Sequence, residues 1–294
     1  LANQVVEGFI SGMHKSPFHG FSAEFSEHKV YNSGESTKHM DWKLYAKTDR
    51  LYTKRYEEET NLRCHIIIDN SSSMHYPKLS SGQLFYENKI GFSVLASAVL
   101  MNILKKQRDA VGLSVFSDSY EYYAPEKGSD RHHRMLLNVL ENLLENQTPK
   151  KTTDTVTYLH QIAEKMHRRS MILLFTDMFQ SDEMNSSEEK LFAALQHLKH
   201  NKHKVVLFHV MDYKTELNFD FDSAPRRFVD LESGEEIAVF ADTIKESYEK
   251  KMQDYFEKVA MTCAQNKIKY IPVSVGENFE KILTAYLIEK QNFG

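Results

Sequence analysis

"IIIDNSSSM", residues 66–74, joins three consecutive isoleucines to an aspartate and three serines. Residues 63–69 form a short apolar run rich in β-branched side chains, which is typical of a strand covered on both faces. Asp69 ends this run, and Ser71 and Ser73 follow two and four residues later. Such oxygen-rich residues after a strand indicate a helix cap, a nucleophile or a metal site.

Strand-like and helix-like segments alternate from residue 62 onward. The expected strands are residues 63–69, 110–116, 171–175, 205–210 and 270–275, with 121–124 continuing the second strand as a hairpin. The expected helices are residues 90–104, 131–144, 156–168, 188–200 and 244–264, and one at the C-terminus. Residues 226–231 and 236–240 flank Gly234, which is a hairpin signal. Strands separated by helices imply a mostly parallel sheet flanked by helices, so the predicted fold class is α/β, doubly wound.

Residues 1–60 differ from the remainder of the chain. They carry short alternating pieces around Trp42, the only tryptophan of the protein. We therefore predict a small β-rich N-terminal appendage over residues 1–60 and a main domain over residues 61–294. A lone tryptophan usually lies in a core or an interface, so the expected role of Trp42 is a buried, structural one.

Composition excludes several classes of protein. The 294 residues carry 41 acidic and 37 basic side chains, a net charge of -4 that does not favour nucleic-acid binding. No apolar run is long enough to span a membrane. Cys64 and Cys263 are far apart and outside any C-x-x-C pair, which predicts reduced thiols and a cytoplasmic location. The first residue is Leu1 and not Met, so the sequence leaves a preceding segment open.

Common catalytic motifs are absent from the sequence. There is no G-x-S-x-G elbow, no phosphate-binding glycine loop and no H-E-x-x-H, and we expect no enzyme. His197, His200 and His203 are spaced by three, but no Cys or carboxylate completes a zinc set. We expect these histidines, and the pair His132-His133, on solvated helix faces.

Asp69 and Asp177 each follow a buried run, and ligands of an open α/β sheet bind outside the carboxyl ends of its strands. Residues 69, 71 and 73 are spaced by two, so their side chains can converge in an extended loop. Further oxygens come from Thr152, Thr153 and Asp154 in one loop and from Thr176 beside Asp177. Hard oxygen ligands suit Mg²⁺, and they also accept Mn²⁺ or Ca²⁺.

Asp69-x-Ser71-x-Ser73 after an apolar strand resembles the metal-ion-dependent adhesion site of von Willebrand factor A-like domains. The resemblance implies the metal ligands Asp69, Ser71, Ser73, Thr153 and Asp177, with a further position left to water or to a carboxylate of a partner. This family usually has glycine before the threonine, whereas Lys151 and Thr152 stand here. The second-loop ligand is therefore open among Thr152, Thr153 and Thr155.

The segment "EFSEHKVYNSGESTKHMDWKLYAKTDRLYTKRYEEE", residues 24–59, resembles the part that precedes this domain in bacterial domain-of-unknown-function family 58. Gly34 and the pair Asp41-Trp42 match the pattern of that family, while Glu35-Ser36 departs from its usual acidic pair. By resemblance, the expected partner is a MoxR-type AAA+ ATPase.

The sequence thus predicts a metal-dependent protein-binding module whose partner presents an acidic side chain. The alternative is a metal-dependent hydrolase acting on a phosphate ester, which needs a general base such as Asp154. A third interpretation, a capped loop without metal, is purely structural.

Overall fold

The computed structural model describes residues 25–31, 40–56, 62–117, 120–145, 155–178, 192–199, 202–222, 224–231, 234–276 and 279–291. The chain divides into two compact units, one of which contains the described residues 25–56 and the other the described residues from 62 to 291.

The smaller unit pairs β1 (Phe25–Val30) with β2 (Tyr52–Tyr56) in an antiparallel ribbon. A short helix that the alternating sequence did not predict, α2 (Trp42–Thr48), lies between them in the chain. Asp41 caps this helix, because its Oδ1 accepts hydrogen bonds from the backbone N–H groups of Lys43 and Leu44 at 3.0 Å each. The indole of Trp42 is 62% exposed, so the prediction of a buried tryptophan is wrong. What Asp41-Trp42 provides here is a helix start, in which the carboxylate forms the contacts.

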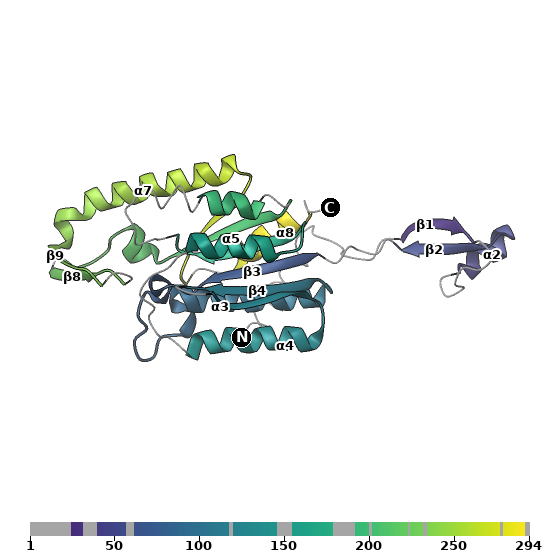
Figure 1. Ribbon diagram of the computed structural model, residues 1–294, viewed down its shortest axis with the longest axis horizontal. Coiled ribbons are helices and arrows are strands. Elements are labelled where there is room, and N and C mark those ends of the chain that lie inside the picture. The colour runs from purple at the N-terminus through teal and green to yellow at the C-terminus, as the bar shows by residue number, and fades with distance from the viewer. Residues whose placement is uncertain are drawn as a thin grey trace. The chain divides into compact units, whose positions relative to one another are not determined.

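The larger unit is built on a six-stranded sheet in the order β10-β7-β6-β3-β4-β5 (Figure 1). These strands are β3 (Arg63–Asp69), β4 (Ala110–Phe116), β5 (Tyr120–Lys127), β6 (Met171–Thr176), β7 (Lys204–Met211) and β10 (Lys269–Ser274). All neighbours are parallel except β4 and β5, which form the predicted hairpin. The strand order reverses between β3 and β6, as in doubly wound folds. The predicted fold class is confirmed.

Helices cover both faces of this sheet, which explains why β3, β4, β6 and β7 are buried almost throughout. The helices are α3 (Lys89–Lys106), α4 (Asp130–Glu145), α5 (Thr155–Lys165), a helix over residues 192–199, α7 (Ala241–Gln265) and α8 (Glu280–Gln291). Figure 1 shows α3 and α4 on one side and α5 and α7 on the other. On the second side, α5, residues 192–199 and α7 share one apolar cluster with β6.

Short elements follow two of the central strands. The 3-10 helix η2 (Ser72–His75) begins three residues after β3, and η3 (Phe85–Glu87) precedes α3. A single π-helical turn, η4 (Tyr213–Leu217), follows β7, and such turns are frequently found at functional sites. Beyond it, β8 (Pro225–Val229) and β9 (Glu236–Phe240) form the hairpin predicted around Gly234.

Three histidines expected on solvated helix faces are buried instead, so that expectation is wrong for them. His132, His133 and His203 are 7%, 5% and 1% exposed. His132 Nε2 donates to the Val111 carbonyl at 3.0 Å, and His203 Nδ1 accepts from the Ser170 N–H at 3.0 Å. Each ring makes at least one hydrogen bond, those of His132 and His203 to the backbone and that of His133 to Asn102 Oδ1, so the core accepts polar side chains that spacing alone had assigned to the surface.

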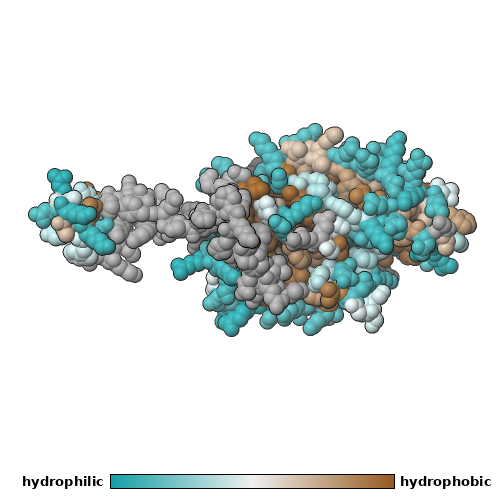
Figure 2. All heavy atoms as spheres, turned by 180° about the vertical axis from the view of Figure 1, so that it is seen from behind, coloured by the Kyte–Doolittle hydropathy of each residue, from teal (hydrophilic) through white to brown (hydrophobic). Residues whose placement is uncertain are grey.

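The surface of the larger unit seen from behind is mainly hydrophilic, with smaller apolar areas between the polar side chains (Figure 2). Both cysteines are buried and unpaired. In the described part of the chain, no helix has an apolar stretch of the length that a bilayer crossing requires.

Candidate functional site

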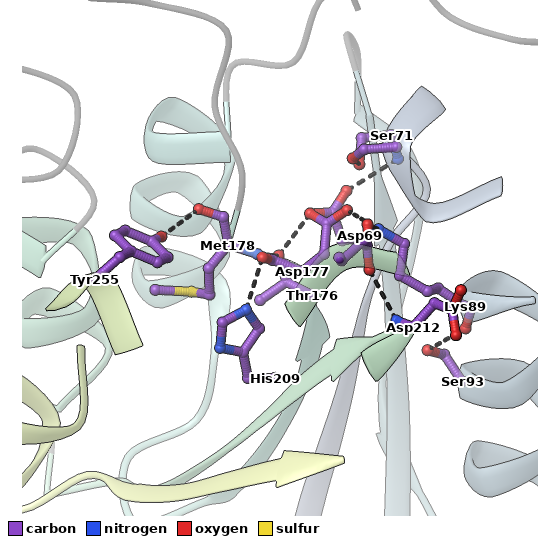
Figure 3. Close-up of polar contacts among 12 residues, drawn as sticks. Asp69, Ser71, Lys89, Ser93, Thr176, Asp177, Met178, His209, Asp212 and Tyr255 are labelled. Carbon is purple, nitrogen blue, oxygen red and sulfur yellow. Dashed lines mark hydrogen bonds and ion pairs between the residues drawn. The ribbon is translucent and has the colours of Figure 1, made fainter. Parts of the chain in front are cut away.

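Two of the predicted metal ligands flank the point where the strand order reverses. Asp69 ends β3 and Asp177 directly follows β6, and these two strands are parallel neighbours. Both residues are buried, at 1% and 0% exposure. Figure 3 shows Asp69, Ser71 and Asp177 around one small region, with Thr176 beside them. The fold thus brings the first and third predicted loops together at the carboxyl edge of the sheet.

The first loop is fixed by Asp69 itself. Asp69 Oδ1 accepts from the Ser71 N–H at 2.9 Å, and the Ser71 and Ser73 hydroxyl oxygens lie 3.1 Å apart. Asn70 ties the loop to β5, since its Nδ2 donates to Glu121 Oε2 at 3.0 Å. Ser71 precedes η2 but makes no side-chain cap bond to it. The capping-type bond in this loop is therefore made by Asp69 and not by Ser71.

The third loop turns sharply after β6. Thr176 Oγ1 donates to Asp69 Oδ2 at 2.7 Å and accepts from the Met178 N–H at 3.0 Å. Met178 has a φ of 59°, in the left-handed region that a non-glycine residue rarely adopts. The Tyr255 hydroxyl donates to the Met178 carbonyl at 2.8 Å and holds the turn. Backbone strain that is fixed from several sides is a recurrent feature of functional sites.

His209 on β7 also stabilises the third loop through a hydrogen bond to its backbone. Its Nε2 donates to the Asp177 carbonyl at 2.8 Å, and its Nδ1 accepts from the Tyr270 hydroxyl at 2.8 Å. Because a carbonyl can only accept, the proton of His209 is on Nε2, and burial favours the neutral ring, in which Nδ1 accepts from Tyr270. Burial lowers the pKa of His209 to about 4.

Lys89, which the sequence analysis did not identify, is the central cation of the site. Its Nζ lies 2.8 Å from Asp177 Oδ2 and 2.6 Å from Glu216 Oε1, and its side chain is fully buried. Burial alone would lower the pKa of Lys89, but Asp177 and Glu216 outweigh it and raise that pKa above its ordinary value. One signal for Lys89 was available, because it is a charged residue directly before the mostly apolar run of residues 90–104.

Glu216 was also missed, because it belongs to the π-helical turn after β7. Its second oxygen, Oε2, accepts from the Asp212 N–H at 2.8 Å. Burial raises the pKa of Glu216, although Lys89 opposes this effect. Burial, reinforced by the charge of Asp177, also raises the pKa of Asp69. Three carboxylates and one ammonium therefore share one buried region.

The donor set fits a hard divalent cation. The 3.1 Å between the Ser71 and Ser73 oxygens is close to the separation of adjacent ligands around octahedral Mg²⁺, about 3 Å for bonds of about 2.0–2.1 Å. Among the described residues, no three His, Cys, Asp or Glu side chains are grouped to hold a metal. A site here would accordingly rely on hydroxyl ligands. Thr152, Thr153 and Asp154 lie outside the described residues, and Thr155 is the first residue of α5.

An apolar groove of about 870 Å³ opens beside the site. Ser73 and Glu216 are among the residues that line it, so the groove adjoins the first loop and the partner of Lys89. Phe219 and Phe228, whose rings stack with centroids 5.4 Å apart, form part of its wall. Aromatic and apolar walls with a few polar groups are typical of binding sites.

A second polar network lies within the sheet. His65 Nδ1 donates to Glu126 Oε1 at 2.6 Å, and His65 Nε2 lies 2.7 Å from Ser114 Oγ. The order serine, histidine, carboxylate is that of a hydrolytic triad. However, His65 and Ser114 are both 0% exposed, so no substrate reaches the hydroxyl. We interpret this network as part of the core.

Comparison with known proteins identifies a family. The family described as "Protein of unknown function DUF58" matches residues 27–258. None of the curated proteins compared with the chain matches it.

The similarity of the chain to solved structures is weaker than its match to this family. The conserved hypothetical protein BatB from Bacteroides thetaiotaomicron is 14% identical, with a TM-score of 0.49 over 79% of this chain and 99% of that chain. An aerotolerance-related membrane protein from Bacteroides fragilis is 17% identical, with a TM-score of 0.49 over the same shares. The SpRpn10 VWA domain is 13% identical, with a TM-score of 0.39 over 76% of this chain and 94% of that chain. With TM-scores below 0.5, none of the three says anything about what this chain does.

Proposed function

Since the chain belongs to the DUF58 family, whose function is unknown, we propose from its site that it is a metal-dependent protein-binding module and not an enzyme. The metal would be Mg²⁺, or else Mn²⁺ or Ca²⁺, held by Asp69, Ser71, Ser73 and Asp177 together with a threonine of the second loop.

One observation carries this proposal. Two hydroxyls at the spacing of adjacent ligands and two buried carboxylates lie at the reversal point of the sheet, and one of those hydroxyl residues, Ser73, also lines the apolar groove. A cation at the first loop would therefore be next to a surface that suits a protein segment. Metal and groove together can bind one partner.

The chemistry of the site favours an anionic partner. Three of the five proposed ligands, Ser71, Ser73 and the threonine, are neutral hydroxyls, so a bound cation would stay more electrophilic than in a site made of carboxylates alone. A carboxylate is the protein group that best satisfies a hard cation with a free coordination position. We therefore propose that the partner presents an acidic side chain. The resemblance seen in the sequence suggests a MoxR-type AAA+ ATPase as that partner.

The experiment is a binding measurement between this protein and the MoxR-type ATPase of the same organism, by biolayer interferometry in Mg²⁺ and in EDTA. Wild type should bind in Mg²⁺ and lose most of its affinity in EDTA, and Asp69→Ala should bind weakly in both. Asp130→Ala is the control, because Asp130 is an exposed carboxylate that pairs with Lys105 outside the site.

Binding that is equal in EDTA and in Mg²⁺ would contradict metal dependence. No binding in either would reject this partner. Hydrolysis of p-nitrophenyl phosphate by wild type, lost in Asp69→Ala, would instead favour the phosphate-ester hydrolase.

A further inference from the structure

Lys89 occupies a position that general physical preferences disfavour. It is the first residue of α3, where the aligned peptide dipoles place partial positive charge. Its side chain is also completely buried, which is costly for an ammonium group. A buried ion pair contributes little to stability compared with well-packed apolar residues in place of both partners. Its location calls for an explanation in the chemistry around it.

The surroundings of Lys89 give that explanation. Its Nζ contacts Asp177, which is one of the proposed metal ligands, at 2.8 Å. It also contacts Glu216 at 2.6 Å, and Glu216 lines the groove. The ammonium thus connects the third loop to the groove, and it supplies a positive charge to the same carboxylate that a metal would use.

A metal ion held by Asp177 and the ammonium of Lys89 would be two cations on one carboxyl group. Like charges that share a buried site repel each other, since little solvent separates them. We propose that Lys89 is a built-in counter-cation that lowers the metal affinity of the Asp69–Ser71–Ser73–Asp177 site. This inference rests on the proposed function and adds the residue that sets how tightly the metal binds.

The probe is Mg²⁺ alone, titrated by calorimetry into four variants and wild type at one pH. Lys89→Met removes the charge and retains a chain of similar length. Lys290→Met is the matched control, because Lys290 is also a mostly buried lysine and pairs with Asp109, which precedes β4 at the opposite edge of the sheet. Asp69→Ala and the double variant Lys89→Met/Asp69→Ala show whether any added affinity belongs to the site.

The expected result is that Lys89→Met binds Mg²⁺ at least tenfold more tightly than wild type. Lys290→Met should bind as wild type does, and both variants that lack Asp69 should not bind. Unfolding in EDTA gives a second readout, because Lys89→Met should lose stability without metal and regain more of it on adding Mg²⁺ than wild type does. A purely structural lysine would change the stability and leave the Mg²⁺ affinity unaltered.

Different outcomes separate this inference from the proposed function. If Lys89→Met binds no more tightly than wild type while Asp69→Ala abolishes binding, the inference is wrong and the metal site stands. If neither wild type nor Lys89→Met binds Mg²⁺ or Mn²⁺, both are wrong.

Lys89→Met leaves two buried carboxylates without their cation, and the variant can fail to fold. Lys89→Met/Glu216→Gln then replaces it, since it removes one positive and one negative charge together. Its expected result is a smaller gain in Mg²⁺ affinity over wild type, and no gain would overturn the inference.

Discussion

Two buried polar networks share strand β3 and differ in what surrounds them. The network of His65, Ser114 and Glu126 lies within the sheet, and the cluster of Asp69, Lys89, Asp177 and Glu216 lies at its carboxyl edge. Four residues separate His65 from Asp69, which is roughly 13 Å along a strand. Packed side chains surround the network at His65, whereas the cluster at the end of the strand lies beside the groove.

The comparison teaches that hydrogen-bond order alone does not make a site. The inner network has the partners of a hydrolytic triad, yet its hydroxyl group is completely buried and no substrate can reach it. Gly112 shows how tightly the inner network is packed, because a Cβ there would lie 2.5 Å from His65 Nδ1. In the edge cluster Lys89 and Asp177 are fully buried as well, but the Glu216 side chain is 15% exposed, and Ser73 and Glu216 line the groove. Access, set by position along the strand, separates core from candidate site.

The largest expected loss of stability comes from a substitution that disrupts the inner network. His65→Leu should lower the free energy of unfolding by about 3–5 kcal/mol, because it leaves the Glu126 carboxylate buried without its partner. The Mg²⁺ affinity should be unchanged. Urea unfolding and calorimetry measure the two quantities. His65→Gln retains a hydrogen-bonding side chain and should lose less stability. A large change in Mg²⁺ affinity with His65→Leu would show that the two networks are not independent.

An intermediate effect on stability is expected from His209, whose ring donates to the backbone carbonyl of Asp177 in the edge cluster. Its folded pKa of about 4 lies below the ordinary value, so the unfolded chain takes up the proton first as the pH falls. Wild type should therefore lose stability between about pH 6.5 and pH 4, by up to about 3 kcal/mol from this group. His209→Gln should show a shallower loss in urea unfolding at pH 7 and pH 4.5 in EDTA.

The pH dependence of the unfolding free energy has to be compared between wild type and His209→Gln, because Asp69 also affects it. The raised pKa of Asp69 makes the folded state more stable as the pH falls, which is opposite in sign to the effect of His209 over the same pH range. Parallel curves for wild type and His209→Gln would contradict the assignment of a neutral, buried His209.

The smallest effect concerns the strained turn of the third loop. Tyr255→Phe removes the hydroxyl that donates to the Met178 carbonyl, and about 1 kcal/mol of stability should be lost. The same variant should weaken Mg²⁺ binding slightly, since Met178 follows Asp177. Tyr123→Phe is a control, because its hydroxyl donates to the Lys165 carbonyl away from the site. Equal effects of the two variants on Mg²⁺ affinity would exclude a specific role for Tyr255.

Much of the fold follows from local sequence. Residues 63–69 and 110–116 are strands with the predicted bounds, because apolar β-branched runs bounded by polar residues have few alternatives in a layered α/β protein. The same pattern brings Asp69 and Asp177 to one edge, since parallel strands end on the same side of a sheet. The N-terminal unit was less predictable, because one capping carboxylate outweighed the alternating pattern around Trp42.

Local sequence was sufficient to predict the class of fold, the strand ends and the oxygen-rich first loop. The contacts of Lys89 with Asp177, 88 residues away, and with Glu216, 127 residues away, became visible only in the folded chain. The same holds for the complete burial of His65, for the burial of His203 and for the groove that Ser73 lines. The difference arises from sequence separation. Periodicity and helix capping depend on a few neighbouring residues, whereas the pairing of buried charges depends on which distant elements pack together.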